Sequence, residues 1–554
     1  MIYPAFQKAE IREWIAFSPS KAEFSGFDSD YAAQMFDKAK VCNCKGNSLY
    51  ISFVCENTYR TEYIAESRRL SSEKYFIDCE KCADGLKITA TVSCRKSLFR
   101  AVNRIIAMSR DESFPIGSIE DYPLFAKRGY IEGFYGNPWS HKNRKMMLEL
   151  MSFYGMNTYY YAPKDDPYHR DKWDELYPEK ELAQLSELAD FCKEYFVDFY
   201  FCIAPGLSMK YSEDADFEKL ACKAHQLYNA GIRNFGLLLD DIPENLYYDS
   251  DKAAFGSEAV NAHIYLANRF CDYLQQIDPN CRLTVCPLQY HGRGDEYYIS
   301  KLGQGLSGKI DIFWTGNNIC SQELTVREAV IFENATNHKP IYWDNFPVND
   351  AEMYNEMHLG YISGREPELY RYSEGVVSNT MESCLSSRIP LLTVCDYLWN
   401  PVVYDEIKSW HNACDIILEE HKETLMPFFD NLLTSCLKVE NSPMMNSALA
   451  DAQQKMFAGD VTGAEKTMQD YIASLKKCCE ALKTLDNPMI SELMPWAEKQ
   501  FIALDLLESA VLIFKDNSPQ IKSKTQKLLN EYLAHPKTLC DFSLQSFAER
   551  MLLL

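Results

Sequence analysis

Two adjacent carboxylates at the end of a short apolar run are the residues of this chain best suited to chemistry. The run covers residues 236–239, the carboxylates are Asp240 and Asp241, and Pro243 follows closely. Charged groups at the end of an apolar run are costly unless they are paired or solvated in a site. Consecutive strand residues point to opposite faces, so both carboxylates can face one cleft only where the strand bends. Pro243 favours such a bend, because it can donate no hydrogen bond to a sheet.

A pair of neighbouring carboxylates is well suited to general acid and base catalysis. Two carboxyl groups this close do not both ionise freely, which helps one of them to keep its proton near neutral pH. A protonated carboxyl beside an ionised one is the arrangement of a general acid with an anionic partner. The alternative is that an aspartate caps a following helix, and the sequence alone leaves that structural role open.

The composition limits the partners and the compartment. The chain of 554 residues has 57 Lys and Arg against 79 Asp and Glu, and a net charge of −22 disfavours nucleic acid or an anionic membrane as a partner. The most apolar helix candidate, 501–514, is too short to span a bilayer. The 20 cysteines are scattered and residues 1–8 do not have the form of a secretion signal, so we expect reduced thiols and a cytoplasmic location.

Short apolar runs alternate with helix-like stretches in the middle of the chain. The runs lie at 129–134, 158–162, 198–204, 235–239, 283–285, 312–314, 341–343 and 375–377. Strands that alternate with helices in this number predict a (β/α)8 barrel, with an open doubly wound sheet as the competing architecture. Polar or aromatic residues close nearly every strand: Tyr135, Lys164, Asp240, Tyr290, Thr315, Asn345 and Asn379. In a parallel barrel these strand ends meet on one face.

The regions on either side have different patterns. Alternating segments at 49–54 and 86–92, and an amphipathic run that Ser97 would cap, predict a small N-terminal α+β domain over residues 1–124. After residue 405 the period of 3.6 residues predicts helices at 444–458, 461–485, 490–515 and 520–534, separated by Gly459, Pro488 and Pro519. The predicted fold is therefore α/β: a central TIM barrel, 125–405, between the N-terminal α+β domain and a C-terminal helical bundle, 406–554.

The barrel segments resemble the strand-end motifs of glycoside hydrolase family 84, which includes the O-GlcNAcases and bacterial hyaluronidase-like β-N-acetylglucosaminidases. In chain order the motifs are Arg-Gly-Tyr-Ile-Glu-Gly-Phe-Tyr-Gly at 128–136, Tyr-Ala-Pro-Lys-Asp-Asp-Pro-Tyr-His-Arg at 161–170, Ala-Pro-Gly at 204–206, the aspartate segment at 236–243, Trp-Thr-Gly at 314–316, Tyr-Trp-Asp-Asn-Phe-Pro-Val-Asn-Asp at 342–350 and Ser-Asn at 378–379. The likeness covers the whole predicted barrel, whereas the flanking regions resemble the family only loosely.

The resemblance implies a retaining β-N-acetylglucosaminidase in which the substrate supplies the nucleophile, an exception to the usual pair of enzyme carboxylates. The 2-acetamido oxygen would attack the anomeric carbon and form an oxazoline. Asp240 would orient the acetamido N–H, while Asp241 would protonate the departing oxygen and then deprotonate the incoming water. No cofactor or metal is implied, and the partner would be a glycan or glycoprotein that contains N-acetylglucosamine.

The same resemblance places residues around the acetamido group. Tyr290 would donate a hydrogen bond to the acetamido oxygen as charge develops there. Trp343 and Cys286 would form the wall of the methyl pocket, with Tyr135 and Thr315 nearby.

Other residues would bind the sugar hydroxyls. Gly133 and Lys164 would meet the 3-hydroxyl, and Gly133 would leave room for a close approach of the backbone. Asp350 would hold the 4- and 6-hydroxyls, and Asn345 and Asn379 would hydrogen-bond the ring or its substituents.

The remaining carboxylates near strand ends have structural interpretations. We interpret Glu132 as structural and the loop pair Asp165 and Asp166 as scaffold. An ion pair with Asp165 or Asp166 is the alternative role for Lys164. A metal-dependent hydrolase is disfavoured, because the chain has 10 histidines and no His-x-His at the first strand.

Because of two departures from the family pattern, the sequence does not predict which leaving group the enzyme prefers. Leu288 and Gln289 stand where the family usually has Thr-Glu, and Asn317 and Asn318 follow Gly316 where proline is common. Removal of O-linked N-acetylglucosamine from protein, a broader β-hexosaminidase activity on glycan or mucin fragments, and an inactive sugar-binding protein remain the alternatives. The oligomeric state is not predicted.

Overall fold

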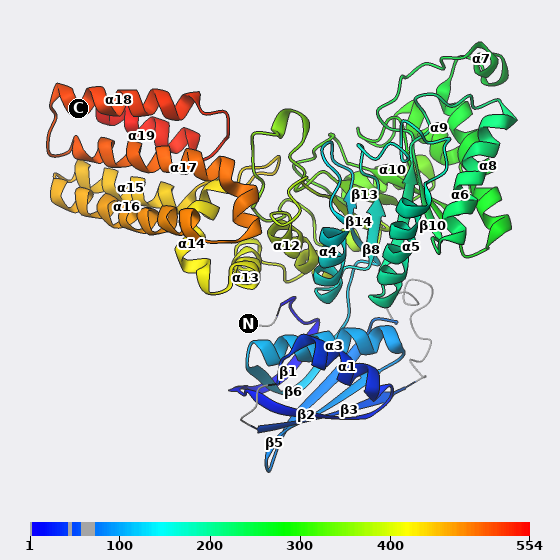
Figure 1. Cartoon of the computed structure of the whole chain (residues 1–554), viewed down its shortest axis with the longest axis horizontal. Coiled ribbons are helices and arrows are strands. Elements are labelled where there is room, and N and C mark those ends of the chain that lie inside the picture. The colour runs from blue at the N-terminus through cyan, green and yellow to red at the C-terminus, as the bar shows by residue number, and fades with distance from the viewer. Residues whose placement is uncertain (1–2, 43–46, 57–71) are drawn as a thin grey trace.

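The computed structural model describes residues 3–42, 47–56 and 72–554, and the chain forms a sheet domain, a barrel and a helical bundle in that order (Figure 1). The N-terminal sheet has the strand order β1-β6-β4-β5-β3-β2. Its strands are β1 Lys8–Ala16, β2 Pro19–Gly26, β3 Asn47–Cys55, β4 Tyr75–Cys82, β5 Gly85–Val92 and β6 Ser113–Asp121. Helices α1 Ser29–Ala39 and α3 Arg95–Arg110 cover the face of this sheet that is turned toward the barrel (Figure 1).

The start of α3 differs from the prediction. The helix begins at Arg95, so Ser97 lies in its first turn and is not the residue that precedes it. The Ser97 hydroxyl instead accepts a hydrogen bond from the backbone N–H of Cys94 at 3.1 Å. Ser97 therefore supplies the second half of a capping box, a role that is also typical of the first turn.

The predicted barrel is confirmed. Its parallel strands are β7 Lys127–Glu132, β8 Thr158–Tyr161, β9 Asp198–Ile203, β10 Asn234–Leu238, β11 Arg282–Cys286, β12 Ile310–Trp314, β13 Pro340–Asp344 and β14 Gly375–Asn379. Pairing of β14 with β7 closes the barrel, which excludes the open doubly wound sheet. The surrounding helices are α4 His141–Phe153, α5 Glu179–Glu194, α6 Asp214–Asn229, α7 Asp249–Phe255, α8 Ala259–Ile277, α9 Tyr297–Gly305, α10 Val326–Thr336, α11 Leu369–Tyr372 and α12 Arg388–Trp399.

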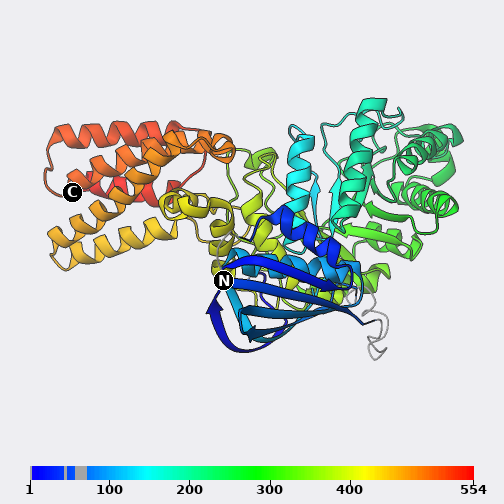
Figure 2. The same ribbon diagram turned by 60° about the horizontal axis from the view of Figure 1, so that its bottom comes forward.

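The C-terminal helical region projects from one side of the barrel (Figure 2). It contains α13 Glu406–Leu418, α14 Lys422–Phe429, α15 Pro443–Phe457, α16 Val461–Thr484, α17 Pro488–Leu512, α18 Pro519–Ala534 and α19 Asp541–Leu553. Pro488 and Pro519 are the first residues of α17 and α18, a position that lacks an internal hydrogen bond in any case. The limits of the domains stay a prediction at 1–124, 125–405 and 406–554.

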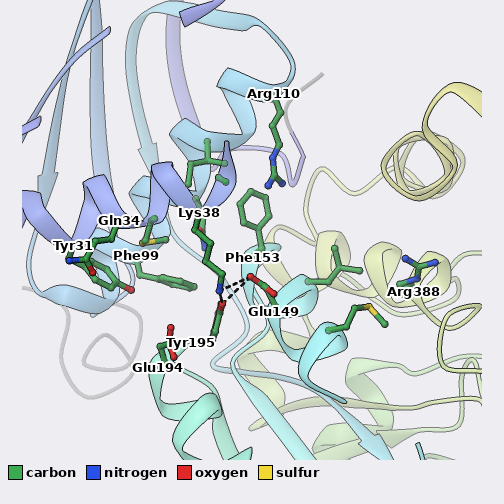
Figure 3. Close-up of a pocket in the computed structure, with 16 residues that line it drawn as sticks. Tyr31, Gln34, Lys38, Phe99, Arg110, Glu149, Phe153, Glu194, Tyr195 and Arg388 are labelled. Atoms are coloured by element: carbon green, nitrogen blue, oxygen red, sulfur yellow. Dashed lines mark hydrogen bonds and ion pairs between the residues drawn. The ribbon is translucent and has the colours of Figure 1, made fainter. Parts of the chain in front are cut away.

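The N-terminal domain meets the barrel at a cavity of about 500 Å³ (Figure 3). Lys38 of α1 pairs with Glu149 of α4 at 2.9 Å and also donates to the hydroxyl of Tyr195. Glu149 and Tyr195 lie near the ends of α4 and α5, which lead into the N-terminal ends of β8 and β9. The small domain is therefore attached at the end of the barrel opposite to the strand ends that carry the predicted site.

Two further observations concern membranes and thiols. Among the helices of the described ranges, none is both long and apolar enough to cross a bilayer. No disulfide joins cysteines within the same ranges.

Candidate active site

The C-terminal ends of the barrel strands surround a cavity of about 400 Å³. All the residues that the sequence analysis placed at the substrate line it: Gly133, Tyr135, Lys164, Asp240, Asp241, Cys286, Tyr290, Thr315, Trp343, Asn345, Asp350 and Asn379. The structure therefore brings together residues that lie as far as 246 positions apart in the chain, as in the contact between the Gly133 backbone and Asn379.

The two aspartates reach the same cavity because the backbone turns at Asp241. Strand β10 ends at Leu238, and the backbone N–H of Leu239 still donates to the Cys286 carbonyl oxygen at 2.9 Å. Asp241 has a left-handed backbone conformation with φ of 54°, which is uncommon for a residue with a side chain. In this fully described stretch the next helix is α7, which begins at Asp249, so the helix-capping alternative is wrong.

A buried lysine lies between the two carboxylates. Lys164 Nζ is 2.7 Å from Asp240 Oδ2 and 3.4 Å from Asp241 Oδ2. Burial by itself raises the pKa of Asp240, but the Lys164 charge and its hydrogen bond outweigh burial and hold that pKa below its ordinary value. Lys164 therefore forms its ion pairs with Asp240 and Asp241, and not with Asp165 or Asp166. Repulsion between the aspartates is therefore partly neutralised by a cation that adjacency in the sequence does not reveal.

One oxygen of Asp240 has no partner. Asp240 Oδ1 is buried and receives no hydrogen bond from any other residue in the described part of the chain. Buried polar atoms are normally paired, so such an oxygen is an acceptor available to a donor from outside the chain. The carboxylate thus presents a fixed, anionic acceptor to the cavity.

Tyr135 and Arg170 form a second set of contacts with Asp241. The Tyr135 hydroxyl donates to Asp241 Oδ2 at 2.7 Å and accepts from a guanidinium nitrogen of Arg170 at 3.0 Å. A second Arg170 nitrogen donates to the Asp241 carbonyl oxygen at 3.3 Å, which supports the left-handed turn. The sequence analysis placed Tyr135 near the methyl pocket and gave Arg170 no role, although Arg170 ends the motif after the second barrel strand.

His169 supports the loop that carries Lys164. Its Nδ1 donates to the Cys202 carbonyl oxygen at 2.7 Å, and its backbone carbonyl accepts from Ala204 at 2.9 Å. Burial lowers the pKa of His169 to about 4, so the ring is neutral at physiological pH. The ring is therefore best described as a buried structural link between the ends of β8 and β9.

The opposite wall is held by hydrogen bonds between its own side chains. Asn379 Oδ1 accepts from the Gly133 backbone at 3.1 Å, and its Nδ2 donates to Asn345 Oδ1 at 3.0 Å. The same Asn345 oxygen accepts from the Trp343 indole at 2.9 Å. A Cβ on Gly133 would lie 2.5 Å from the Trp343 ring, so glycine permits this close packing. These polar atoms largely bind one another, and they fix the position of the Trp343 face.

Tyr290, Cys286 and Thr315 add uncharged groups to the lining, and Asp350 adds a further carboxyl group. Burial raises the pKa of Tyr290, so its hydroxyl keeps its proton and can donate. Burial likewise raises the pKa of Cys286, which leaves an uncharged thiol in the wall. Thr315 donates to the Asn318 carbonyl oxygen at 2.7 Å and so orders the loop after β12. Asp350 Oδ2 accepts from the Tyr135 backbone at 2.8 Å, and burial raises the pKa of this carboxyl group.

The two buried carboxylates interpreted as structural, Glu132 and Asp166, accept hydrogen bonds from neighbouring side chains. Glu132 is fully buried and accepts from two guanidinium nitrogens of Arg144, at 2.7 and 2.9 Å, and from the Tyr159 hydroxyl. Asp166 accepts from the hydroxyls of Tyr161 and Tyr177, each at 2.6 Å. Asp165 is exposed and does not line the cavity.

Comparisons with known proteins identify the relatives of this chain. Residues 128–430 match the model of the beta-N-acetylglucosaminidase family. Protein O-GlcNAcase of Rattus norvegicus and of Mus musculus are each 31% identical over 291 residues, which is 51% of this chain and 30% of theirs. A mutant of the Thermobaculum terrenum O-GlcNAc hydrolase is 29% identical, with a TM-score of 0.73 over 77% of this chain and 95% of that one. CpGH84B is 26% identical, with a TM-score of 0.83 over 100% of both chains.

The fold and the cavity define a TIM-barrel protein whose strand ends carry a cavity lined by carboxylates. The family model covers more than half of the chain, so the chain belongs to the beta-N-acetylglucosaminidase family, and the resemblance to glycoside hydrolase family 84 is confirmed. The chain spans about 30% of the length of the curated relatives that it matches.

Proposed function

We propose that the protein hydrolyses terminal β-linked N-acetylglucosamine with retention of configuration, and that the acetamido group of the substrate is the nucleophile. The supporting observation is Asp240, which Lys164 holds in the anionic form while one buried carboxylate oxygen stays without a partner in the described residues. An acetamido N–H is a donor that suits this oxygen. The enzyme need not supply a nucleophile if the acetamido oxygen makes the attack.

In the first step the acetamido oxygen attacks the anomeric carbon while the glycosidic bond breaks. Asp240 accepts the acetamido N–H and stabilises the positive charge that develops on the oxazoline. Asp241 gives its proton to the departing oxygen. Because the nucleophile belongs to the substrate, much of the orientational entropy is lost on binding and not during the reaction.

In the second step Asp241 takes a proton from water, which attacks the anomeric carbon and opens the oxazoline. Tyr290 donates to the acetamido oxygen, and Trp343, Cys286 and Thr315 enclose the methyl group. The contacts of Tyr135 with Asp241 fix the carboxyl group that must lose and regain a proton.

The hydroxyls of the sugar meet the rest of the lining. We assign the 3-hydroxyl to Gly133 and Lys164, and the 4- and 6-hydroxyls to Asp350. Asn345 and Asn379 contribute by holding the wall of the cavity that faces the sugar ring. The aglycone is a protein or a glycan, and a protein that carries O-linked N-acetylglucosamine is the first candidate, because the curated relatives are named Protein O-GlcNAcase.

Hydrolysis of an aryl β-N-acetylglucosaminide should be compared with that of its N-trifluoroacetyl analogue and of the plain β-glucoside. Fluorine withdraws electron density from the acetamido oxygen, so we expect a steep loss of kcat/KM with the analogue and no turnover of the glucoside. Equal turnover of all three substrates would show that a group of the protein is the nucleophile and would refute the proposal.

A second comparison separates the candidate aglycones. A protein carrying O-linked N-acetylglucosamine and a free oligosaccharide with the same terminal sugar should be offered at equal concentrations. Preference for the protein supports an O-GlcNAcase-like role, whereas preference for the oligosaccharide supports the broader β-hexosaminidase alternative.

A further inference from the structure

Two cysteines from distant segments meet at the edge of the active-site cavity. Cys320 lies in the loop after β12 and lines the cavity beside Asn345. Cys436 lies between α14 and α15, and its thiol donates to the Asn345 backbone oxygen at 3.4 Å. The two thiols are also within hydrogen-bonding reach of each other.

The two loops are held together by contacts that do not involve sulfur. Lys438 pairs with Glu323 at 2.6 Å, only a few residues beyond each cysteine. Asn345 Nδ2 donates to the Ile319 carbonyl oxygen at 2.8 Å, so Asn345 touches both loops. The two loops are therefore held near each other by contacts besides those of the thiols themselves.

The loop that carries Cys320 is further fixed from within the barrel. The Arg365 guanidinium, which pairs with buried Asp344, donates to the carbonyl oxygens of Ser321 at 3.1 Å and Gln322 at 3.0 Å. Asn318 and Ser321 also bond to each other across the turn. The loop has little freedom to carry Cys320 away from Cys436.

The environment makes Cys320 the more acidic thiol of the pair. A hydrogen bond from Cys436 lowers the pKa of Cys320 from its ordinary value, despite burial, whereas the pKa of Cys436 is raised by the same interaction and by burial. The Cys436 proton has two acceptors within reach, the Asn345 oxygen and the Cys320 sulfur. Both residues are partly exposed, so small oxidants can reach them. Cys286, in the same cavity, is buried and its pKa is raised, which makes it a poor nucleophile.

We propose that Cys320 and Cys436 form a reversible oxidation site at the mouth of the active site, with Cys320 as the reacting thiolate and Cys436 as the resolving thiol. A peroxide oxidises Cys320: the thiolate attacks one peroxide oxygen, the O–O bond breaks, and protonation of the other oxygen releases water and leaves a sulfenic acid. The Cys436 sulfur then attacks the Cys320 sulfur, the S–O bond breaks, and a second water leaves as the disulfide forms. Two thiols have lost two hydrogens, and one peroxide has been reduced to two waters.

The disulfide would act on the wall that Asn345 organises. Oxidation removes the Cys436 hydrogen bond to Asn345, whose side chain holds Trp343 and Asn379. It also joins the β12 loop covalently to the C-terminal helical region. We expect kcat/KM to fall several-fold in the oxidised protein and to recover on reduction. This effect on turnover rests on the proposed function, whereas the covalent chemistry does not.

The test treats the full-length protein with a small excess of hydrogen peroxide, blocks remaining thiols with an alkylating agent and maps the peptides by mass spectrometry. A peptide pair linked through Cys320 and Cys436, lost after treatment with dithiothreitol, is the expected result. Links dominated by other cysteines, or no link at peroxide levels that oxidise surface thiols, would overturn the proposal.

Three variants assign the roles. Cys436→Ser should leave a sulfenic acid on Cys320 that a dimedone probe traps, and Cys320→Ser should abolish both the probe adduct and the disulfide. Cys222→Ser removes an exposed thiol of α6 far from the cavity lining and should change neither product. If Cys320 in the unaltered protein reacts no faster than Cys222, the site has no special reactivity and the proposal is wrong. Peptide mapping needs no turnover, so a failed activity assay would count against the proposed function and leave this result intact.

Discussion

The strand ends of the barrel carry two kinds of buried carboxylate. Those of one kind have their oxygens bound by other side chains and stabilise the fold, whereas the other kind has an oxygen available to a substrate. Glu132, the last residue of β7, has both oxygens bound by Arg144. Asp166, after β8, accepts from two tyrosine hydroxyls. Asp240, after β10, has one oxygen on Lys164 and the other without a partner in the described residues.

Burial does not distinguish these groups. Asp166 and Asp240 are each 8% exposed, and both lie at the same end of the barrel. The available hydrogen-bonding capacity is what differs. A carboxylate whose acceptors are filled stabilises the fold, because removing its partners would leave buried charges unpaired. A carboxylate with an open acceptor can receive a hydrogen bond from a substrate. The following experiments test that distinction.

The largest effect is expected for Asp241→Asn with a substrate that has a poor leaving group. An amide cannot protonate the departing oxygen, and loss of a general acid typically costs about 10²–10⁴-fold in rate. Activated aryl glycosides need little protonation, so their loss should be much smaller. Steady-state kinetics on both substrate classes measure the contrast, and equal losses would remove Asp241 from the acid role.

Asp240→Asn should slow all substrates regardless of their leaving group. The variant loses the charge that stabilises the developing oxazoline, and removal of one such electrostatic partner typically costs about 10²–10³-fold. The rate of a first turnover with an aryl substrate reports this step. A variant that keeps the full rate would show that the open acceptor of Asp240 has no part in catalysis.

Glu132→Gln should have the opposite profile. Arg144 would lose its charged partner in a buried site, and breaking such a pair costs about 3–5 kcal/mol in the free energy of unfolding. Urea denaturation measures this loss, and kcat of the protein that remains folded should change little. If kcat of the folded protein fell as much in Glu132→Gln as in Asp240→Asn, the distinction between filled and open carboxylates would be contradicted.

Much of the fold could be predicted because its signals are local. Each barrel strand is a short apolar run, and α15 to α18 show the helical period over many residues. The end of the chain was not assigned a helix, although α19 Asp541–Leu553 forms there. The start of α3 was misplaced because a serine in the first turn and a serine at the cap give similar sequence patterns.

The site was predicted as a set of residues but not as a set of contacts. Strand-end motifs bring the lining residues to one face, so their membership follows from the barrel and the family likeness. Arg170 and Cys436 form hydrogen bonds with residues from distant segments of the chain. The residues next to them in the sequence give no sign of these hydrogen bonds. The left-handed turn at Asp241 was also missed, because Pro243 offered a simpler cause for the bend. Distances between loops depend on the whole barrel, which no local pattern contains.

The smallest effect is expected on the pH dependence of kcat/KM. The pKa of Asp240 lies below its ordinary value of 3.8 because Lys164 outweighs burial, so ionised Asp240 contributes stability above about pH 4 and loses it as the pH falls through the lowered pKa. Lys164→Met removes the cation and leaves burial, which raises the Asp240 pKa. The acid limb of kcat/KM should then move to higher pH, by about 1–3 units.

The pH profiles of the two proteins should be measured over a range in which circular dichroism shows both to be folded. Lys164→Met will also reduce the rate itself, since Lys164 is assigned to the 3-hydroxyl, so the position of the limb and not its height is the readout. A matched Lys172→Met variant removes an exposed lysine from the surface, where Lys172 pairs with Glu175, and should leave the limb in place. If the limb stays fixed in Lys164→Met as well, Asp240 does not owe its charge to this lysine, and its open oxygen would have to be explained by other means.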